Sequence, residues 1–292
     1  MNDVFIVGCG DIGRRIGAIA RDRGLKTAGL ARSEESARRL RAAEIIPVQG
    51  DLDRAQSLCD LPLAGKVLLY LAPPPAEGDT DPRLRNLLAA IRREALPARI
   101  VLISTTAVYG DCAGAWIDED QPTAPQTPRG KRRLDAEQAL RTWADEHRVA
   151  YVILRVGGIY GPGRLPVARL EQGLPILAEA ESPYTNRIHQ DDLAAICMAA
   201  AERGHPGEVY NVADGHPGTM SQYFIDVAHT LGLLPPPEVS RDEAERVMSA
   251  GMLSYLQESR RLDNRKLREE LGVSLHYPDL AAGLAALKTN DK

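Results

Sequence analysis

The chain has 292 residues, of which 44% are hydrophobic and 26% charged, as is ordinary for a globular protein. Its net charge of −4 and its aromatic content of 4% argue against a nucleic-acid-binding protein, which usually carries a basic excess and stacking side chains. No apolar run approaches the ~20 residues that cross a bilayer. The first residues show no signal-peptide pattern, so we expect a cytoplasmic protein without a membrane partner.

Metal chemistry is not expected either. The four cysteines form no C-x-x-C pair, and the six histidines include no H-E-x-x-H. These spacings fit neither a zinc site nor a disulfide framework. We therefore predict no metal site.

A glycine-rich turn follows the first predicted element. Residues 4–7 form an apolar run that predicts a buried parallel strand, and G-x-G-x-x-G comes directly after it, before an amphipathic helix. In this position the three glycines provide a tight turn, room for a pyrophosphate and close packing of helix on strand. The helix N-terminus offers free N–H groups to the phosphates. The predicted phosphate-binding residues are Gly8, Gly10, Asp11, Ile12 and Gly13.

The end of the second predicted strand, over residues 26–31, indicates which cofactor binds. Arg32 follows it, about where a ribose-binding acid would sit, ~20 residues after the glycine motif. An acid there would bind the ribose hydroxyl of NAD, whereas an arginine can pair with the 2′-phosphate of NADP. We therefore expect NADP in preference to NAD, with Arg32 and Ser33 in the site. The alternative is that Arg32 only caps a surface turn.

Strands and helices continue to alternate. The next predicted elements are a helix over 34–43, strands over 45–49 and 66–72, a helix over 82–96 and a strand over 100–104. This alternation predicts a doubly wound parallel sheet, a Rossmann-type α/β fold. Ligands bind such sheets at the carboxyl ends of the strands, so Asp51, Leu52, Leu71 and Ala72 are expected in the cofactor site. Asp51 could contact the adenine, cap the next helix, or do both.

Four later segments carry a family resemblance. They are residues 104–111 (STTAVYGD), 154–164 (LRVGGIYGPGR), 186–193 (NRIHQDDL) and 209–213 (VYNVA). In this order they resemble the extended short-chain dehydrogenase/reductase superfamily, whose members carry S-[ST]-x-x-V-Y-G, L-R-x-x-x-I-Y-G-P-G, I-H-x-x-D and V-Y-N motifs. The P-R-G and I-Y-G-P-G-R stretches are similar to its atypical, YeeZ-like subgroup, which lacks the active-site Tyr.

The resemblance implies a substrate-binding hydroxyl at Thr105 but not the family's catalytic Tyr and Lys. Arg129 falls at the Tyr position and Arg133 at the Lys position. Arginine cannot exchange a proton at neutral pH. These residues and Glu137 are four apart and share a helix face. That face could clamp an anionic substrate or cofactor phosphate, or it could be a solvated face with an Arg133–Glu137 ion pair.

Other groups could transfer the proton. Tyr109 has suitable chemistry, although the V-Y-G motif is usually structural, and His189 titrates near neutrality. By resemblance, a smaller substrate lobe begins at residue 164. We predict a dinucleotide-binding domain over 1–163 and 189–213 and a substrate lobe over 164–188 and 214–292. The predicted substrate-binding residues are Arg164, Arg187 and His189.

Two functions remain open. The first is an NAD(P)-dependent oxidoreductase or epimerase that acts on a polar, anionic small molecule, which could be nucleotide-linked. The second is a catalytically inactive NAD(P)-binding sensor or scaffold, favoured by the missing Tyr and Lys. Fold alone cannot decide between them. The resemblance also implies a possible homodimer.

Overall fold

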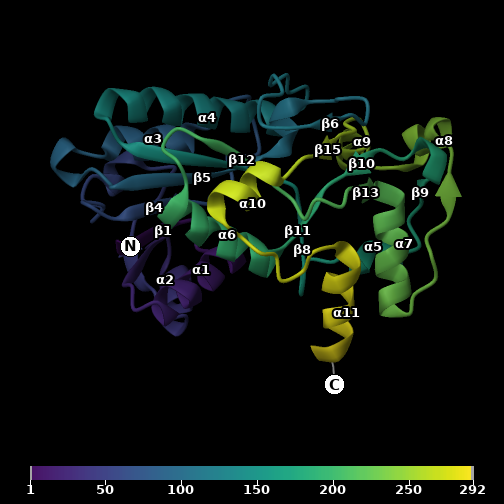
Figure 1. Ribbon diagram of the computed structural model, residues 1–292, viewed down its shortest axis with the longest axis horizontal. Coiled ribbons are helices and arrows are strands. Elements are labelled where there is room, and N and C mark those ends of the chain that lie inside the picture. The colour runs from purple at the N-terminus through teal and green to yellow at the C-terminus, as the bar shows by residue number, and fades with distance from the viewer. Residues whose placement is uncertain (1, 291–292) are drawn as a thin grey trace.

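A seven-stranded parallel sheet forms the centre of the computed structural model, which describes residues 2–290 (Figure 1). Its strand order is β12-β7-β5-β4-β1-β2-β3, and every neighbouring pair is parallel. This is the predicted Rossmann-type arrangement. The strands are β1 (Val4–Val7), β2 (Thr27–Ala31), β3 (Ile46–Gln49), β4 (Val67–Tyr70), β5 (Arg99–Thr105), β7 (Ala150–Val156) and β12 (Val209–Val212).

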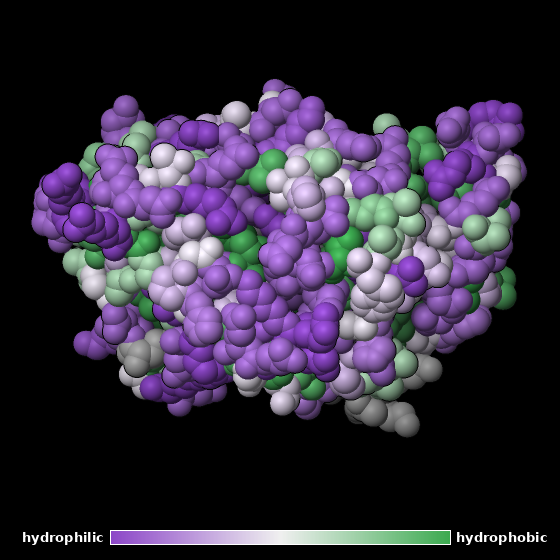
Figure 2. All heavy atoms as spheres, turned by 45° about the horizontal axis from the view of Figure 1, so that its top comes forward, coloured by the Kyte–Doolittle hydropathy of each residue, from purple (hydrophilic) through white to green (hydrophobic). Residues whose placement is uncertain are grey.

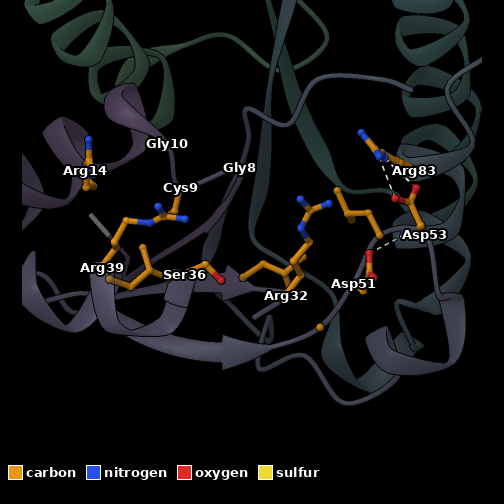
Figure 3. A pocket seen from close by; sticks show the side chains of 14 residues that line it. Gly8, Cys9, Gly10, Arg14, Arg32, Ser36, Arg39, Asp51, Asp53 and Arg83 are labelled. Carbon is orange, nitrogen blue, oxygen red and sulfur yellow. Dashed lines mark hydrogen bonds and ion pairs between the residues drawn. The ribbon is translucent and has the colours of Figure 1, made fainter. Parts of the chain in front are cut away.

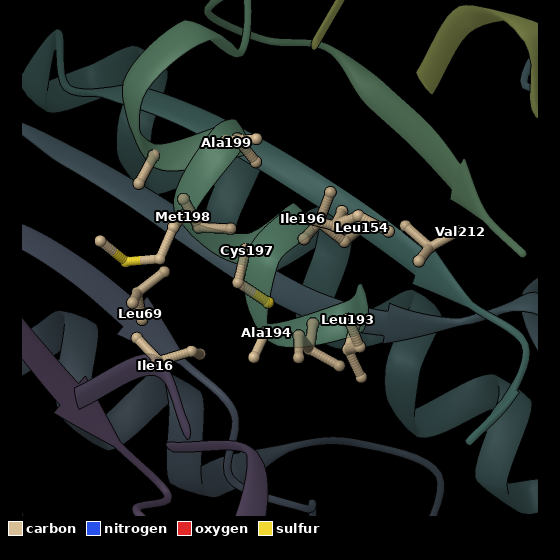
Figure 4. Packing of buried hydrophobic residues seen from close by; sticks show 14 of the residues in the cluster. Ile16, Leu69, Leu154, Leu193, Ala194, Ile196, Cys197, Met198, Ala199 and Val212 are labelled. Carbon is tan, nitrogen blue, oxygen red and sulfur yellow. The ribbon is translucent and has the colours of Figure 1, made fainter. Parts of the chain in front are cut away.

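Helices cover both faces of this sheet because its strands are apolar on both sides. Val4 and Ile6 of β1 belong to the core under α1 (Asp11–Asp22), α6 (Gln190–Arg203) and α10 (Arg265–Leu271). Phe5 and Val7 alternate to the opposite face and pack under α3 (Pro82–Ala90) and α4 (Pro128–His147). Figure 4 shows the small and branched side chains of α6 that lie on the sheet. The remaining helix of this part is α2 (Glu34–Ala42), which packs on β2 and β3.

A second, smaller hydrophobic core lies at one end of the molecule, away from α2 (Figure 1). Its elements are α5 (Val167–Glu171), β9 (Ile176–Leu177), α7 (Met220–Leu231), β14 (Glu238–Val239), α8 (Arg241–Val247), α9 (Ala250–Tyr255) and α11 (Leu280–Asn290). The other short strands are β6 (Trp116–Ile117), β8 (Gly158–Tyr160), β10 (Tyr184–Thr185), β11 (Arg187–His189), β13 (Gly218–Thr219) and β15 (Arg261–Leu262). The 3-10 turns are η1 (Ala55–Leu58), η2 (Arg93–Ala95), η3 (Thr106–Tyr109) and η4 (Glu179–Glu181). Hydrophilic residues dominate the face in Figure 2, with apolar residues in small separate patches.

Most predicted element boundaries are close to the observed ones, with one clear exception. The helix predicted over 82–96 ends at Ala90, because Ile91 turns to extended backbone and η2 follows it. The predicted division into two domains stays a prediction. The observed cores do show that α10, which falls within the predicted substrate lobe, contributes Leu267 and Leu271 to the core of the main sheet.

Candidate active site

The glycine turn between β1 and α1 is shaped as a dinucleotide loop requires. Gly8 has φ of +90°, and a Cβ there would lie 2.5 Å from the Ala72 nitrogen, so only glycine fits this approach of β1 to β4. A Cβ on Gly13 would lie 3.3 Å from the Gly8 oxygen, which accounts for close packing of helix on strand. A Cβ on Gly10 would have no atom within 4 Å, so space remains there for a ligand.

The first turn of α1 is open to an anion, yet it carries an acid. No side chain caps this helix, so its leading N–H groups, at Asp11 and Ile12, are available to a phosphate. The Asp11 carboxylate is held 3.3 Å from Arg15 Nε and 3.4 Å from Arg164 Nε. Two cations therefore offset the charge of Asp11 beside the loop.

A cavity of about 460 Å³ opens beside this loop at the carboxyl ends of β1 and β2 (Figure 3). Of the predicted cofactor residues, those that line it are Gly8, Gly10, Arg32, Asp51 and Leu52. The others lie in the adjoining turn, in α1, or at the end of β4. The other lining residues are Cys9, Arg14, Leu30, Ser36, Arg39, Leu40, Gly50, Asp53 and Arg83.

Arg32 faces this cavity as a cation with no ion pair within 4.0 Å among the residues that the structure describes. Ser33 has a different task from the one predicted: its side chain accepts a hydrogen bond from Ser36 N at 3.2 Å and caps α2. The helix α2 is therefore capped by Ser33, and the role of Arg32 in cofactor binding stays a prediction. Arg39 lines the same wall one helical turn beyond Ser36 and pairs with Glu35 at 2.9 Å.

The opposite wall of the first cavity is held by a bidentate ion pair. Arg83 donates to both carboxylate oxygens of Asp53 at 2.8 Å, and these hydrogen bonds lower the pKa of Asp53. Asp51 accepts from Asp53 N at 3.1 Å, while the N-cap position of η1 is Arg54, whose side chain makes no capping hydrogen bond. The alternative in which Asp51 caps the next helix is therefore wrong, and its place in the cavity wall remains.

A second cavity, of about 370 Å³, lies at the carboxyl end of β5 and extends to the smaller lobe. Four predicted residues line it: Thr105, Arg129, Arg164 and Arg187. Arg260 lines it as well, and Glu258 is its one lining carboxylate among the described residues. The cavity is therefore strongly cationic. Thr105 is half-buried, and its hydroxyl accepts a long hydrogen bond from Ala107 N at 3.4 Å.

Arg129, at the place of the missing Tyr, joins the two lobes. Its guanidinium donates to Ser254 Oγ at 3.1 Å and to Ser254 O at 3.3 Å. The same group lies 3.9 Å from the ring centre of Tyr255 and 3.6 Å from Glu258. It therefore holds α9 over the entrance of the second cavity.

Arg133 and Glu137 correct the picture of a solvated helix face. Arg133 is largely enclosed, with 12% of its side chain exposed, donates to Ala72 O at 3.1 Å and lies 4.0 Å from the Asp81 carboxylate. Glu137 is 1% exposed and pairs with Arg155 of β7 at 2.8 Å, while Ser104 donates to it at 2.6 Å. No Arg133–Glu137 pair forms. Arg133 and Glu137 are both turned toward the sheet, where each binds a different partner.

The two alternative proton-transfer groups lie outside both cavities. Tyr109 is buried, its hydroxyl donates to Asn211 at 2.7 Å, and burial raises its pKa to about 12. His189 is also buried, and its Nδ1 accepts from Asp191 N at 3.2 Å to cap α6. Burial lowers the pKa of His189, and its ring packs 3.8 Å from that of Tyr277. His189, predicted to bind substrate, does not line the second cavity, because its side chain is used inside the fold.

Two negative findings concern residues 2–290 alone. They hold no group of three or more His, Cys, Asp or Glu side chains that could bind a metal ion. None of the helices in this part of the chain combines the length and apolar character needed to span a bilayer.

The parallel sheet, its order and the glycine turn define a protein of the Rossmann class. The model of the NAD dependent epimerase/dehydratase family matches residues 4–213, and the chain belongs to this family. The predicted superfamily is thereby confirmed. Protein YeeZ of Escherichia coli K12 is 25% identical over 288 residues, which are 96% of this chain and 97% of YeeZ.

Two solved structures illustrate how far the likeness extends. A conserved protein of unknown function from Silicibacter pomeroyi is 30% identical, covers 100% of both chains and has a TM-score of 0.83. MoeE5 in complex with UDP-glucose and NAD covers 100% of both chains at 20% identity, with a TM-score of 0.75, and shows the shared fold.

Proposed function

We propose that the chain is an NAD(P)-dependent oxidoreductase or epimerase that acts on a polar, anionic small molecule, which could be nucleotide-linked. The observation that carries this proposal is the meeting of two cationic cavities at the start of α1. Arg164 lines the second cavity and pairs with Asp11, which follows Gly10 of the first cavity. A cofactor in the first cavity can therefore extend toward a substrate in the second.

The residues divide the work between binding and orientation. When bound, the nicotinamide cofactor supplies the hydride chemistry. Thr105 offers a hydroxyl to the substrate oxygen, and the arginines of the second cavity offset its negative charge. Arg129 can bind and orient the substrate but cannot transfer a proton to it, because a guanidinium does not release its proton at neutral pH. MoeE5, a protein of the same fold, holds UDP-glucose and NAD, which supports this choice of ligand classes.

The NADP preference makes a direct prediction at Arg32. Calorimetric titration of cofactor-free protein should give a Kd for NADPH at least about tenfold below that for NADH, or ~1.4 kcal/mol. Arg32→Ala should remove this gap, because the unpaired guanidinium in the first cavity would no longer meet the 2′-phosphate. Arg38→Ala, an exposed change on α2, should leave the gap intact. Equal affinities in the parent protein would refute the preference and keep a dinucleotide site.

The alternative is an inactive cofactor-binding sensor or scaffold. It is favoured by Arg129 and Arg133, since both stand at the catalytic positions and both are engaged in contacts within the fold. A kinetic screen of hydroxy and keto acids and nucleotide sugars, followed through NADPH absorbance for oxidoreduction and through product chromatography for epimerisation, separates the two. We expect turnover that Thr105→Ala abolishes and that Thr142→Ala, an exposed threonine on α4, preserves. Cofactor binding without turnover on any compound would favour the sensor.

Two further parts of the proposal concern the whole protein. We propose a cytoplasmic location, and the family resemblance implies a possible homodimer in solution. Sedimentation velocity checks the second, since a monomer at micromolar concentration would contradict it. Cell fractionation checks the first.

A further inference from the structure

Arg187 is a cation with no carboxylate partner. Its Nε is sealed from solvent without a hydrogen-bond partner, and no carboxylate of residues 2–290 lies within 4.0 Å of it. The Nη2 atom contacts only the Met220 sulfur, at 3.3 Å, and the guanidinium lies 3.9 Å from the ring centre of Tyr223. A thioether is a weak acceptor. Arg187 is partly buried, and a guanidinium held away from water without an anion is destabilised, so this arrangement calls for a counter-ion.

The backbone is built to hold this guanidinium in place. Arg187 pairs with Gly158 in the parallel β8–β11 ladder, and a Cβ on Gly158 would lie only 2.2 Å from Arg187 Nη1. Any side chain at position 158 would therefore displace the guanidinium. Its neighbour Gly157 is equally close to β11, since a Cβ there would lie 2.8 Å from the Asn186 oxygen. The G-G pair allows the arginine to lie flat against β8 on the wall of the second cavity.

No acid around this cavity is free to serve as the counter-ion. Glu258 accepts from Arg260 at 2.9 Å and from Thr127 at 3.2 Å, and it lies 3.6 Å from Arg129. Asp214 is an acid whose charge reaches Arg187, but it lies beyond ion-pair distance. The positive charge of Arg187 is therefore left for a ligand.

We propose that Arg187 binds an oxyanion of the substrate, a phosphoryl or carboxylate group, in the same cavity as the Thr105 hydroxyl. This inference rests on the proposed function, because it assigns the anion to the substrate. The cavity of about 370 Å³ is of a size for one small ligand. The substrate therefore carries its negative charge close to the group that reacts, and a neutral compound leaves Arg187 without a counter-ion.

Titration calorimetry on NADPH-saturated protein tests this assignment with three probes: inorganic phosphate, malonate and UDP. We expect at least one probe to bind, and Arg187→Met to weaken it about tenfold or more, as for loss of a charge-assisted hydrogen bond. Arg268→Met removes the same charge from an exposed site on α10 and should leave binding unchanged. The tightest probe identifies the source of the oxyanion.

Gly158→Ala provides an independent arm that keeps the arginine. The added methyl group should displace the guanidinium and weaken the same probe, while far-UV circular dichroism confirms folding. Unchanged probe affinity in Arg187→Met, or no binding of any probe, would overturn the assignment. NADPH titration of the same proteins separates the two proposals: if NADPH binds and the probes do not, only the oxyanion site fails. If neither NADPH nor NADH binds, the proposed function fails.

Discussion

Asp214 is a single buried carboxyl group whose titration should be visible in the stability of the protein. It is 5% exposed, it accepts from His216 N at 2.9 Å, and its other oxygen has no partner among the described residues. Burial raises its pKa from the ordinary 3.8 to about 6. Because the folded state holds this proton more tightly, the associated stability is fully present below about pH 4 and is lost as the pH rises through about 6.

Asp214→Asn should therefore stabilise the protein at high pH. Asparagine keeps an acceptor for His216 N and removes the charge, so we expect a gain in unfolding free energy of about 2 kcal/mol at pH 8. The gain should vanish near pH 4, where the parent carboxyl is protonated. Urea unfolding at both pH values measures it, with the exposed Asp242→Asn as the control. A gain that is equal at both pH values would show that the carboxyl is not the cause.

Single residues could be predicted from the sequence where local geometry sets their role. The three glycines follow from a turn that has to be tight, open and close-packed, and Arg32 follows from its distance to that turn. The Arg83–Asp53 pair joins residues 30 positions apart, so no local pattern announces it. His189 shows the opposite failure, since a titratable residue in a motif can be used entirely as a helix cap.

At the scale of elements, α4 shows what periodicity can and cannot establish. The spacing of four correctly puts Arg129, Arg133 and Glu137 on one face. Periodicity does not say whether that face is buried, and here the charged Glu137 is buried against the sheet beside the apolar Ala136 and Leu140. Arg129 reaches α9, Arg133 reaches the end of β4, and Glu137 reaches β7. Each partner is distant in sequence, which is why the expectation of an Arg133–Glu137 pair is wrong.

For the whole molecule, the alternation of strands and helices was sufficient to predict the sheet, but not how the chain after residue 213 is distributed. The helix α10 adds Leu267 and Leu271 to the main core, whereas α7 and α11 build the smaller one. Short parallel pairs such as β6 with β15 then tie the two parts together. Two-residue strands carry too little pattern to be recognised in a sequence, so this connection appears only in three dimensions.

The buried Glu258 should hold the two parts of the molecule together. It is 4% exposed, accepts from Thr127 at the start of α4, and balances Arg129 and Arg260. Glu258→Gln keeps the shape and the Thr127 contact but leaves two cations without their anion. Breaking a buried pair in this way should cost about 3 kcal/mol of unfolding free energy.

Urea unfolding of Glu258→Gln measures this loss, and two spectroscopic signals can show which part of the molecule is destabilised. If Glu258 joins the two cores, the unfolding transitions seen by tryptophan fluorescence and by far-UV circular dichroism should coincide in the parent. They should separate in the variant, because the smaller core then unfolds first. Glu171→Gln, an exposed change in α5, should alter neither the midpoint nor the coincidence. A variant as stable as the parent would mean that Arg129 and Arg260 are solvated well enough without Glu258, and that apolar contacts alone hold the lobes together.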